Sequence, residues 1–225
     1  MIKRSKNIVV NAMKRTIVCF GDSNTWGYDA ETDQRFNDEI RWTGLLQSEL
    51  CNTYRVIEEG LPGRTSVSDD PLFEGLAGIA YLYPCLMSHA PLDLVVIMLG
   101  TNDTKERFAL TSYNIAQGIV RLALKARGSG TGPSGKAPEV LVIAPPPIGA
   151  EYIHTPIGKP MGSNCSEKSL ELSQHLAALL SGTDIHFIDS REYVSMNEID
   201  YMHLDIQGHR NMADLVQDHV KRILK

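Results

Sequence analysis

Short apolar runs alternate with longer mixed stretches along this chain. Five runs are apolar enough to form buried strands: Thr16–Phe20, Tyr54–Glu58, Leu92–Leu99, Val140–Ala144 and Ile185–Ile188. The run Leu92–Leu99 is almost continuously apolar, which is typical of a central parallel strand covered on both faces. The sequence therefore predicts a parallel sheet with a buried centre.

The stretches between these runs have the spacing of amphipathic helices. The predicted helices are Trp42–Leu50, Tyr113–Ala126, Ser169–Leu180 and Gln207–Leu224. In the second of them, Ile115, Ile119 and Leu122 recur on one face. The alternation of strands and helices predicts an α/β fold, a three-layer α/β/α sandwich. We expect a five-stranded parallel sheet with the flavodoxin-like order 2-1-3-4-5.

Two stretches lack these patterns. Residues 128–138 are rich in glycine, serine and proline and predict a flexible surface connector. Residues 145–165 predict a long connection without regular structure after the fourth strand. Such long loops are often binding walls, and this one leaves the carboxyl edge of the sheet, where ligands bind in open α/β folds. We therefore expect residues 148–164 to line a binding pocket.

Composition and charge narrow the function classes. The 225 residues are 43% hydrophobic, which suits one core, and we expect a single domain over residues 13–225 after a tail, residues 1–12. The net charge of −5 gives no general attraction to nucleic acid or to a membrane surface. The basic start of the chain lacks the apolar core of a signal peptide, and no run of about 18 apolar residues can span a bilayer.

The four cysteines show neither CxxC spacing nor the density of a disulfide scaffold. A reducing, cytoplasmic location is therefore expected. Cys19 lies within the first apolar run, so we expect it to be an inert core residue.

A candidate nucleophile follows the first predicted strand, in the sequence Gly21–Asn24. Glycine permits a sharp turn, and Ser23 would then begin a helix whose free N–H groups favour a developing oxyanion. Asp22 and Ser23 are also ordinary helix caps. The segment alone therefore leaves both interpretations open.

Three later segments supply the other groups that an acyl-transferring serine needs. Gly60 and Gly63 follow the second strand, although glycines there could serve only a turn. Asn102 follows the third strand with an amide that can stabilise an oxyanion or form an Asx turn. Asp200 precedes His203 by three residues, a spacing that lets the carboxylate orient Nδ1 and leaves Nε2 as the base.

Asp205 and His209 offer an alternative acid and imidazole nearby. The spacing favours the pair Asp200 and His203, and His209 is expected on the final helix. All four segments meet at one edge of the predicted sheet. Together they predict a serine hydrolase, because free serine needs both a base and preorganised donors.

These motifs resemble those of the SGNH (GDSL) hydrolases over nearly the whole chain. The motifs are GDSN (21–24), GLPGRT (60–65), GTND (100–103) and DYMH (200–203). The resemblance implies a nucleophile at Ser23, a base at His203 and an orienting carboxylate at Asp200. It implies an oxyanion hole formed by the backbone N–H groups of Ser23 and Gly63 and the side chain of Asn102. It implies no metal and no organic cofactor.

The chain is most similar to the bacterial arylesterase/acyltransferase branch, in phrases such as Arg41–Gly44 and Ile97–Lys105. This similarity implies that short-chain acyl esters, aryl and acetyl, are hydrolysed through an acyl-enzyme, with possible transfer to alcohols or peroxide. It also implies a homo-oligomer. The chain departs from the branch at Asn24, where leucine is usual, and in the 148–164 loop.

Further pocket walls are expected at Asp22, Trp26 and Thr104, although Trp26 could equally be a packing residue beside the turn. Two alternative functions remain. One is a carbohydrate O-acetylesterase, which would share the machinery and differ in the polarity of the pocket. The other is a catalytically silent binding module.

Overall fold

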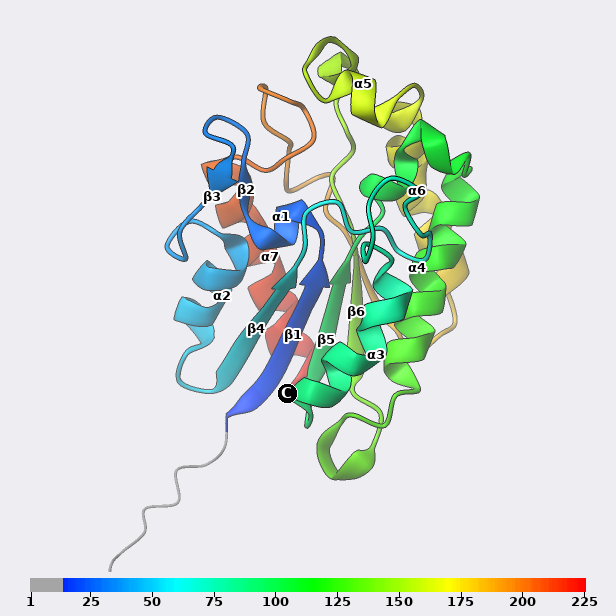
Figure 1. Cartoon of the computed structure of the whole chain (residues 1–225). Coiled ribbons are helices and arrows are strands. Elements are labelled where there is room, and N and C mark those ends of the chain that lie inside the picture. Colours follow the sequence, from blue (N-terminus) through cyan, green and yellow to red (C-terminus); the bar gives the residue numbers. More distant parts are fainter. Residues whose placement is uncertain (1–13) are drawn as a thin grey trace, which may run out of the picture.

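Five parallel strands form the centre of the molecule. The computed structural model describes residues 14–225, so the predicted tail, residues 1–12, lies outside the described residues. The strands are β1 (Arg15–Gly21), β4 (Tyr54–Gly60), β5 (Leu94–Met98), β6 (Glu139–Ala144) and β7 (His186–Asp189). Their order in the sheet is β4-β1-β5-β6-β7, and every neighbouring pair is parallel (Figure 1). The predicted order 2-1-3-4-5 is confirmed.

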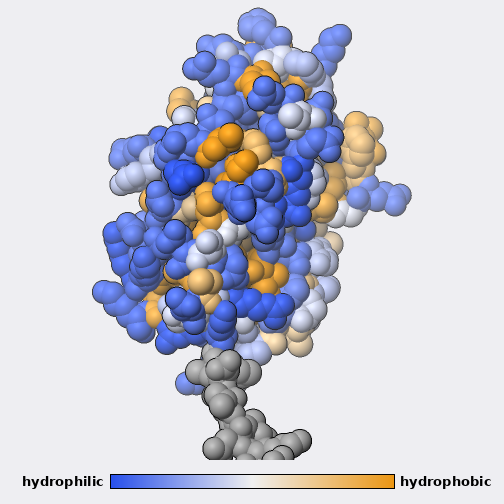
Figure 2. Space-filling model, turned by 90° about the vertical axis from the view of Figure 1, so that its left-hand side faces the viewer, coloured by the Kyte–Doolittle hydropathy of each residue, from blue (hydrophilic) through white to orange (hydrophobic). Residues whose placement is uncertain are grey.

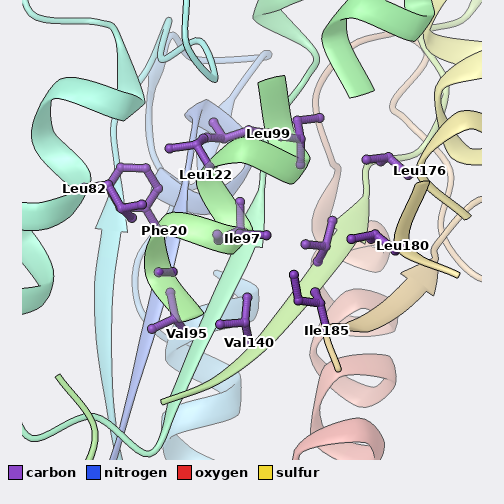
Figure 3. Packing of buried hydrophobic residues seen from close by; sticks show 14 of the residues in the cluster. Phe20, Leu82, Val95, Ile97, Leu99, Leu122, Val140, Leu176, Leu180 and Ile185 are labelled. Carbon is purple, nitrogen blue, oxygen red and sulfur yellow. The ribbon is translucent and has the colours of Figure 1, made fainter. Parts of the chain in front are cut away.

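Helices cover both faces of the sheet, as the three-layer prediction requires. One face carries α3 (Gly78–His89), α4 (Ser112–Arg127) and α6 (Cys165–Leu180), and the other carries α2 (Trp42–Leu50) and α7 (Ile206–Ile223). Figure 3 shows the first of these two cores, where strand residues such as Phe20 and Ile97 meet helix residues such as Leu82 and Leu122. Trp42 and Val216 belong to the second core.

The central strand β5 explains the nearly continuous apolar run in the sequence. Val95 and Ile97 pack in one core, whereas Leu94, Val96 and Met98 pack in the other. Successive side chains of a strand point to opposite faces, so a strand covered on both sides needs apolar residues at every position.

Several elements were not predicted. Helix α3 lacks the usual start signal, because its N-cap Ala77 has no side chain that can cap, and it contains Pro84. The hairpin of β2 (Tyr28–Asp29) and β3 (Gln34–Arg35) is too short for a periodic pattern.

The prediction that residues 145–165 lack regular structure is wrong. They contain the 3-10 helix η4 (Ala150–His154) and the short helix α5 (Gly158–Met161). Ile148, Tyr152 and Met161 are buried in a third, small core that also contains Met202, and the Tyr152 hydroxyl donates to Gly162 O at 2.6 Å. The segment is therefore held by this core and by its own hydrogen bonds.

The connector at residues 128–138 is likewise attached to the body of the protein. It contains the 3-10 helix η3 (Pro133–Gly135), and Thr131 is buried. The carbonyl oxygen of Thr131 accepts from Leu92 N at 2.8 Å, so the connector is hydrogen-bonded to the start of the central strand region.

The surface on the α2 side is largely hydrophilic, with smaller hydrophobic areas (Figure 2). Among the described residues, no helix combines the length and the apolar character needed to cross a bilayer. All four cysteines are free thiols, and Cys19 is buried in the core as expected. Burial raises the pKa of the Cys19 thiol far above its ordinary value.

Candidate active site

The nucleophile segment forms a sharp turn between β1 and the short helix α1 (Ser23–Trp26). Asp22 is the N-cap of α1, and its Oδ1 accepts from Asn24 N at 3.0 Å. A Cβ atom on Gly21 would lie 2.8 Å from Met98 O, so only glycine allows this turn to pack against the next strand. Ser23 is thereby fixed at the carboxyl end of β1, at the top of the sheet in Figure 1.

Ser23, His203 and Asp200 form a continuous hydrogen-bonded series. His203 Nε2 lies 2.9 Å from Ser23 Oγ, and His203 Nδ1 lies 2.5 Å from Asp200 Oδ2. All three residues are buried. The structure therefore brings together the three residues that the sequence selected as nucleophile, base and orienting acid.

The loop that carries Asp200 and His203 is held by its own hydrogen bonds. Asp200 Oδ1 accepts from Met202 N at 3.0 Å and from His203 N at 3.1 Å, and Asn197 Oδ1 accepts from Asp200 N at 2.8 Å. Burial raises the pKa of Asp200, but the hydrogen bond and charge of His203 and these backbone donors outweigh it and lower the pKa below its usual value. The carboxylate is therefore ionised beside the imidazole at neutral pH.

Asn24 connects the nucleophile turn to the histidine loop. Its Nδ2 donates to Met202 O at 3.1 Å, and its Oδ1 accepts from Leu204 N at 2.9 Å. These two bonds lie on either side of His203. The residue that departs from the arylesterase pattern thus joins the two segments that carry the base and the nucleophile, a role that the sequence analysis missed.

Three hydrogen-bond donors converge near Ser23. Asn102 Nδ2 is buried and has no hydrogen-bond partner within residues 14–225. The backbone N–H groups of Ser23 and Gly63 likewise meet no acceptor in the described part of the chain. Gly63 has φ of +84°, a conformation that favours glycine. Buried donors are normally paired, so three unpaired donors beside one serine suit an oxyanion.

Buried polar side chains tie the donor loops together. The Asp103 carboxylate accepts from Ser66 N at 2.9 Å and from Ser66 Oγ at 2.5 Å, which links the Asn102 loop to the Gly63 loop. Burial raises the pKa of Asp103 to about 6, although the Ser66 hydrogen bonds partly offset the rise. Arg64 Nη1 donates to Gly21 O at 2.9 Å, which links the Gly63 loop to the nucleophile turn.

A cavity of about 220 Å³ opens beside the serine. Its walls combine the reacting groups with mostly apolar side chains from five segments of the chain: Ser23, Tyr28, Pro62, Gly63, Asn102, Lys105, Ile157, Pro160, Met161, Met202 and His203. Ile157, Pro160 and Met161 belong to the 148–164 segment, which therefore lines the cavity as expected. Tyr28 was not predicted; it comes from the small hairpin, and its ring centroid lies 4.4 Å from that of His203.

The expectation that Asp22, Trp26 and Thr104 form the walls is wrong for this cavity, because none of them lines it. Asp22 points into the turn as a cap and is 1% exposed. The Thr104 hydroxyl donates to Thr101 O at 2.6 Å. The guanidinium carbon of Arg35 lies 5.3 Å from the centroid of the Trp26 ring, so Trp26 is a packing residue.

The alternative imidazole, His209, lies on α7 as predicted. Its Nδ1 accepts from Trp42 N at 3.3 Å, and burial lowers its pKa to about 4. Asp205 caps the same helix, with Oδ1 accepting from Gly208 N at 2.6 Å. His209 is therefore a neutral core residue, and Asp205 serves the helix rather than the serine.

The sequence profile of the GDSL-like lipase/acylhydrolase family matches residues 19–211. This chain belongs to that family. The resemblance seen in the sequence motifs is thereby confirmed. A search of curated proteins gave no match.

Solved structures of this family are closely similar to the chain. A carbohydrate acetylesterase from Sinorhizobium meliloti is 40% identical, with a TM-score of 0.87 over 93% of this chain and 100% of that one. An aryl esterase from M. smegmatis is 37% identical, with a TM-score of 0.86 over 93% of this chain and 99% of that one. Together with the family match, these similarities establish the chain as a GDSL-type carboxylic ester hydrolase.

Proposed function

We propose that this GDSL hydrolase cleaves short-chain acyl esters, acetyl and aryl, through an acyl-enzyme on Ser23. One observation carries the proposal. The series Asp200–His203–Ser23 ends at a small, mostly apolar cavity that also contains the unpaired amide of Asn102. Such a site can activate a hydroxyl and stabilise the negative charge that follows its attack.

The hydrogen-bonded series supports a sequence of proton transfers. His203 Nε2 removes the Ser23 Oγ proton while Oγ attacks the ester carbonyl carbon. The carbonyl oxygen becomes an oxyanion beside the N–H groups of Ser23 and Gly63 and the Asn102 amide. The imidazolium, stabilised by the Asp200 carboxylate, then protonates the leaving alcohol or phenol. A water molecule repeats the sequence on the acyl-enzyme and regenerates Ser23.

The size of the cavity supports short acyl groups. Its volume of about 220 Å³ is below the ~300–1,000 Å³ common for ligand pockets. Ile157, Pro160 and Met161 form part of its wall. A panel of acetyl, butyryl and octanoyl p-nitrophenyl esters tests this limit, and we expect kcat/KM to fall with chain length. Equal rates for acetyl and octanoyl esters would contradict it.

The central experiment is Ser23→Ala with p-nitrophenyl acetate. We expect activity to fall by at least ~10³-fold, as removal of a serine nucleophile does in other serine hydrolases. The far-UV spectrum and melting temperature should match those of the unaltered protein, because Ser23 Oγ contributes one hydrogen bond. Retained activity in a folded Ser23→Ala protein would exclude the assignment.

A carbohydrate O-acetylesterase is the second candidate. It is favoured by the 40% identity to the Sinorhizobium meliloti carbohydrate acetylesterase. The apolar side chains around the cavity favour an aryl or alkyl leaving group instead. Turnover of an acetylated xylose and of phenyl acetate, measured side by side, separates the two candidates by the ratio of kcat/KM.

A silent binding module would have the same fold without turnover. The complete set of base, acid and donors around Ser23 argues against it. A fluorophosphonate probe distinguishes them, because only an activated serine is phosphonylated. Labelling of the unaltered protein and none of Ser23→Ala is expected.

Transfer of the acyl group to an alcohol or peroxide is part of the same proposal, because any small nucleophile that enters the cavity can replace water. Ester formation from added alcohol during p-nitrophenyl acetate turnover measures it. We also propose a homo-oligomer in a reducing, cytoplasmic compartment. Exposed Leu72 and Phe73, at 68% and 58%, and the four free thiols support these points. Light scattering and cell fractionation test them.

A further inference from the structure

A second cluster of reactive side chains lies at the edge strand β4 of the sheet. Glu59 stands near the carboxyl end of β4, and Cys85 and His89 stand on α3. One ligand atom of each residue lies within 4.8 Å of those of the other two. None of the three lines the cavity beside Ser23.

The local fold explains why these atoms converge. Cys85 and His89 are four residues apart on α3, so they share one face of the helix. The helix packs so that this face meets the end of β4, where His89 Nε2 lies 2.8 Å from Glu59 Oε1. Cys85 is fully buried, whereas Glu59 and His89 are half-buried. The sulfur atom of the cluster is therefore buried, whereas its carboxylate and imidazole are partly exposed to solvent.

The charges of the cluster suit a divalent cation. A thiolate from Cys85 and the carboxylate of Glu59 supply two negative charges, and His89 supplies a neutral nitrogen. A doubly charged ion bound to these three groups gives a net charge of zero. That balance matters here because the Arg64 guanidinium is adjacent and would oppose any excess of positive charge.

We propose that Glu59, Cys85 and His89 form a zinc-binding site. Sulfur, nitrogen and carboxylate oxygen are the donor types that zinc prefers, and three protein ligands leave a fourth position for water. Ions can reach the site, because His89 lines a surface hollow of about 680 Å³ and Glu59 lines another of about 480 Å³. Binding replaces the Cys85 S–H bond with a sulfur–zinc bond and releases that proton to solvent. It also replaces the His89–Glu59 contact, with no change of oxidation state.

The bound ion would link α3 to the edge strand β4. The contact between Glu59 and His89 already connects these two elements. A zinc ion would replace it with three coordinate bonds, one to β4 and two to α3. A ligand that binds only the folded state raises its stability by mass action. The site is independent of the proposed ester hydrolysis, whose groups need no metal.

Cobalt(II) is the probe, because it occupies zinc sites and reports its ligands by absorption. The experiment uses the full chain without an affinity tag, treated with a chelator and then titrated with cobalt chloride at pH 7.5. We expect one equivalent to give a near-ultraviolet thiolate-to-cobalt band with the visible bands of four-coordinate cobalt. Zinc chloride should abolish both bands stoichiometrically, and it should raise the melting temperature.

The variants identify the ligands. Cys85→Ser should lose the near-ultraviolet band, and His89→Ala and Glu59→Gln should each weaken binding at least ~10-fold, the loss that even an outer partner of a ligand causes. Cys51→Ser is the matched control, because Cys51 is an exposed thiol outside the cluster and its loss should leave the titration unchanged. His89 lies at the surface end of α3, so His89→Ala tests the proposal even if Cys85→Ser is poorly folded.

Two results would overturn the proposal. One is the absence of a thiolate band at a large excess of cobalt. The other is a pattern of variants that places the ion elsewhere. Such a pattern would be an unchanged titration in His89→Ala or the loss of the band in Cys51→Ser. Ester hydrolysis is read separately in every sample, so a failure here is distinct from a failure of the proposed function.

Discussion

Two clusters in this hydrolase each contain a hydroxyl or thiol, an imidazole and a carboxylate, but the three groups are arranged differently. Ser23, His203 and Asp200 form a series in which the imidazole stands between the hydroxyl and the carboxylate. In the other cluster, the atoms of Cys85, His89 and Glu59 converge on one point, and the imidazole contacts the carboxylate through Nε2. In the series, a proton can pass from the hydroxyl to the imidazole while the carboxylate stabilises the imidazolium, whereas a convergent set suits a cation.

The two nucleophile atoms also differ in their electrostatic surroundings. Ser23 has a base at 2.9 Å and, beside it, the Asn102 amide nitrogen, which is unpaired within residues 14–225. Burial, reinforced by the charge of Glu59, raises the pKa of the Cys85 thiol to about 12. Residue types alone therefore do not make a nucleophile; the position of the imidazole and the neighbouring donors do.

The two imidazoles should give a sharp contrast when each is replaced. His203→Ala should lower kcat on p-nitrophenyl acetate by ~10³-fold or more, because Ser23 loses its base. His89→Ala is the matched control and should stay within about twofold, the range of surface substitutions. Comparable losses in both variants would break the distinction between the two clusters.

The carboxylates give a similar but separate test. Asp200→Asn should lower kcat by up to ~10⁴-fold, since an amide can hold the wrong tautomer of His203 while preserving the geometry. Glu59→Gln should leave kcat unchanged. Steady-state kinetics on both variants, with circular dichroism as the check of folding, measures the contrast, and full activity in Asp200→Asn would contradict the proposed role.

The oxyanion donor has no counterpart in the second cluster. Asn102→Ala should lower kcat by ~10²–10³-fold with little change in KM, because the amide acts mainly on the transition state. Asn102→Asp tests the same point, because aspartate has a similar shape but lacks the N–H donor. A change confined to KM would indicate ground-state binding instead.

Asn24→Leu should have a moderate effect. It removes both bonds that flank His203 and leaves Met202 O and Leu204 N unpaired, at about 1–3 kcal/mol for each buried group. We expect kcat to fall by at most ~10-fold, which corresponds to the loss of about one such group. The melting temperature should also be lower. Asn24→Asp, which can keep the bond from Leu204 N, should lose less. Unchanged kcat and stability in Asn24→Leu would show that the histidine loop is held by other contacts.

The smallest effect is expected for alkylation. The Cys85 thiol stays protonated at pH 8 because its pKa is about 12, so iodoacetamide should modify exposed Cys51 and spare Cys85. Cys85 is also fully buried, which keeps the reagent away from its sulfur atom. Peptide mass spectrometry at pH 8 measures both sites, with Cys51 as the internal control. Rapid labelling of Cys85 would show that its thiol is activated.

The sequence predicted what depends on period and on position at a strand end. The buried run Leu92–Leu99 indicated the central strand, and the sheet order placed Ser23, Asn102 and His203 on one edge. Helix α3 escaped prediction because Pro84 and an uncapped start obscure its pattern. Tyr28 comes from a two-residue strand, too short for any period.

The tertiary connections were the other part that the sequence could not supply. The bonds from Asn24 to Met202 and Leu204 span 178 and 180 residues. The hydrogen bond from Ser66 N to Asp103 Oδ1 spans 37 residues. No local pattern encodes such pairs, because they depend on how separate loops meet after the sheet has formed.

The small core around Ile148, Tyr152 and Met161 has a practical consequence. The cavity wall formed by this segment packs in a core distinct from the two that cover the sheet, and it shares that core with Met202, the neighbour of His203. Substitutions at Ile157 and Pro160 can therefore reshape substrate preference with little disturbance of the base. A change at Met161 would also reach the loop that carries the base, so it couples substrate preference to turnover.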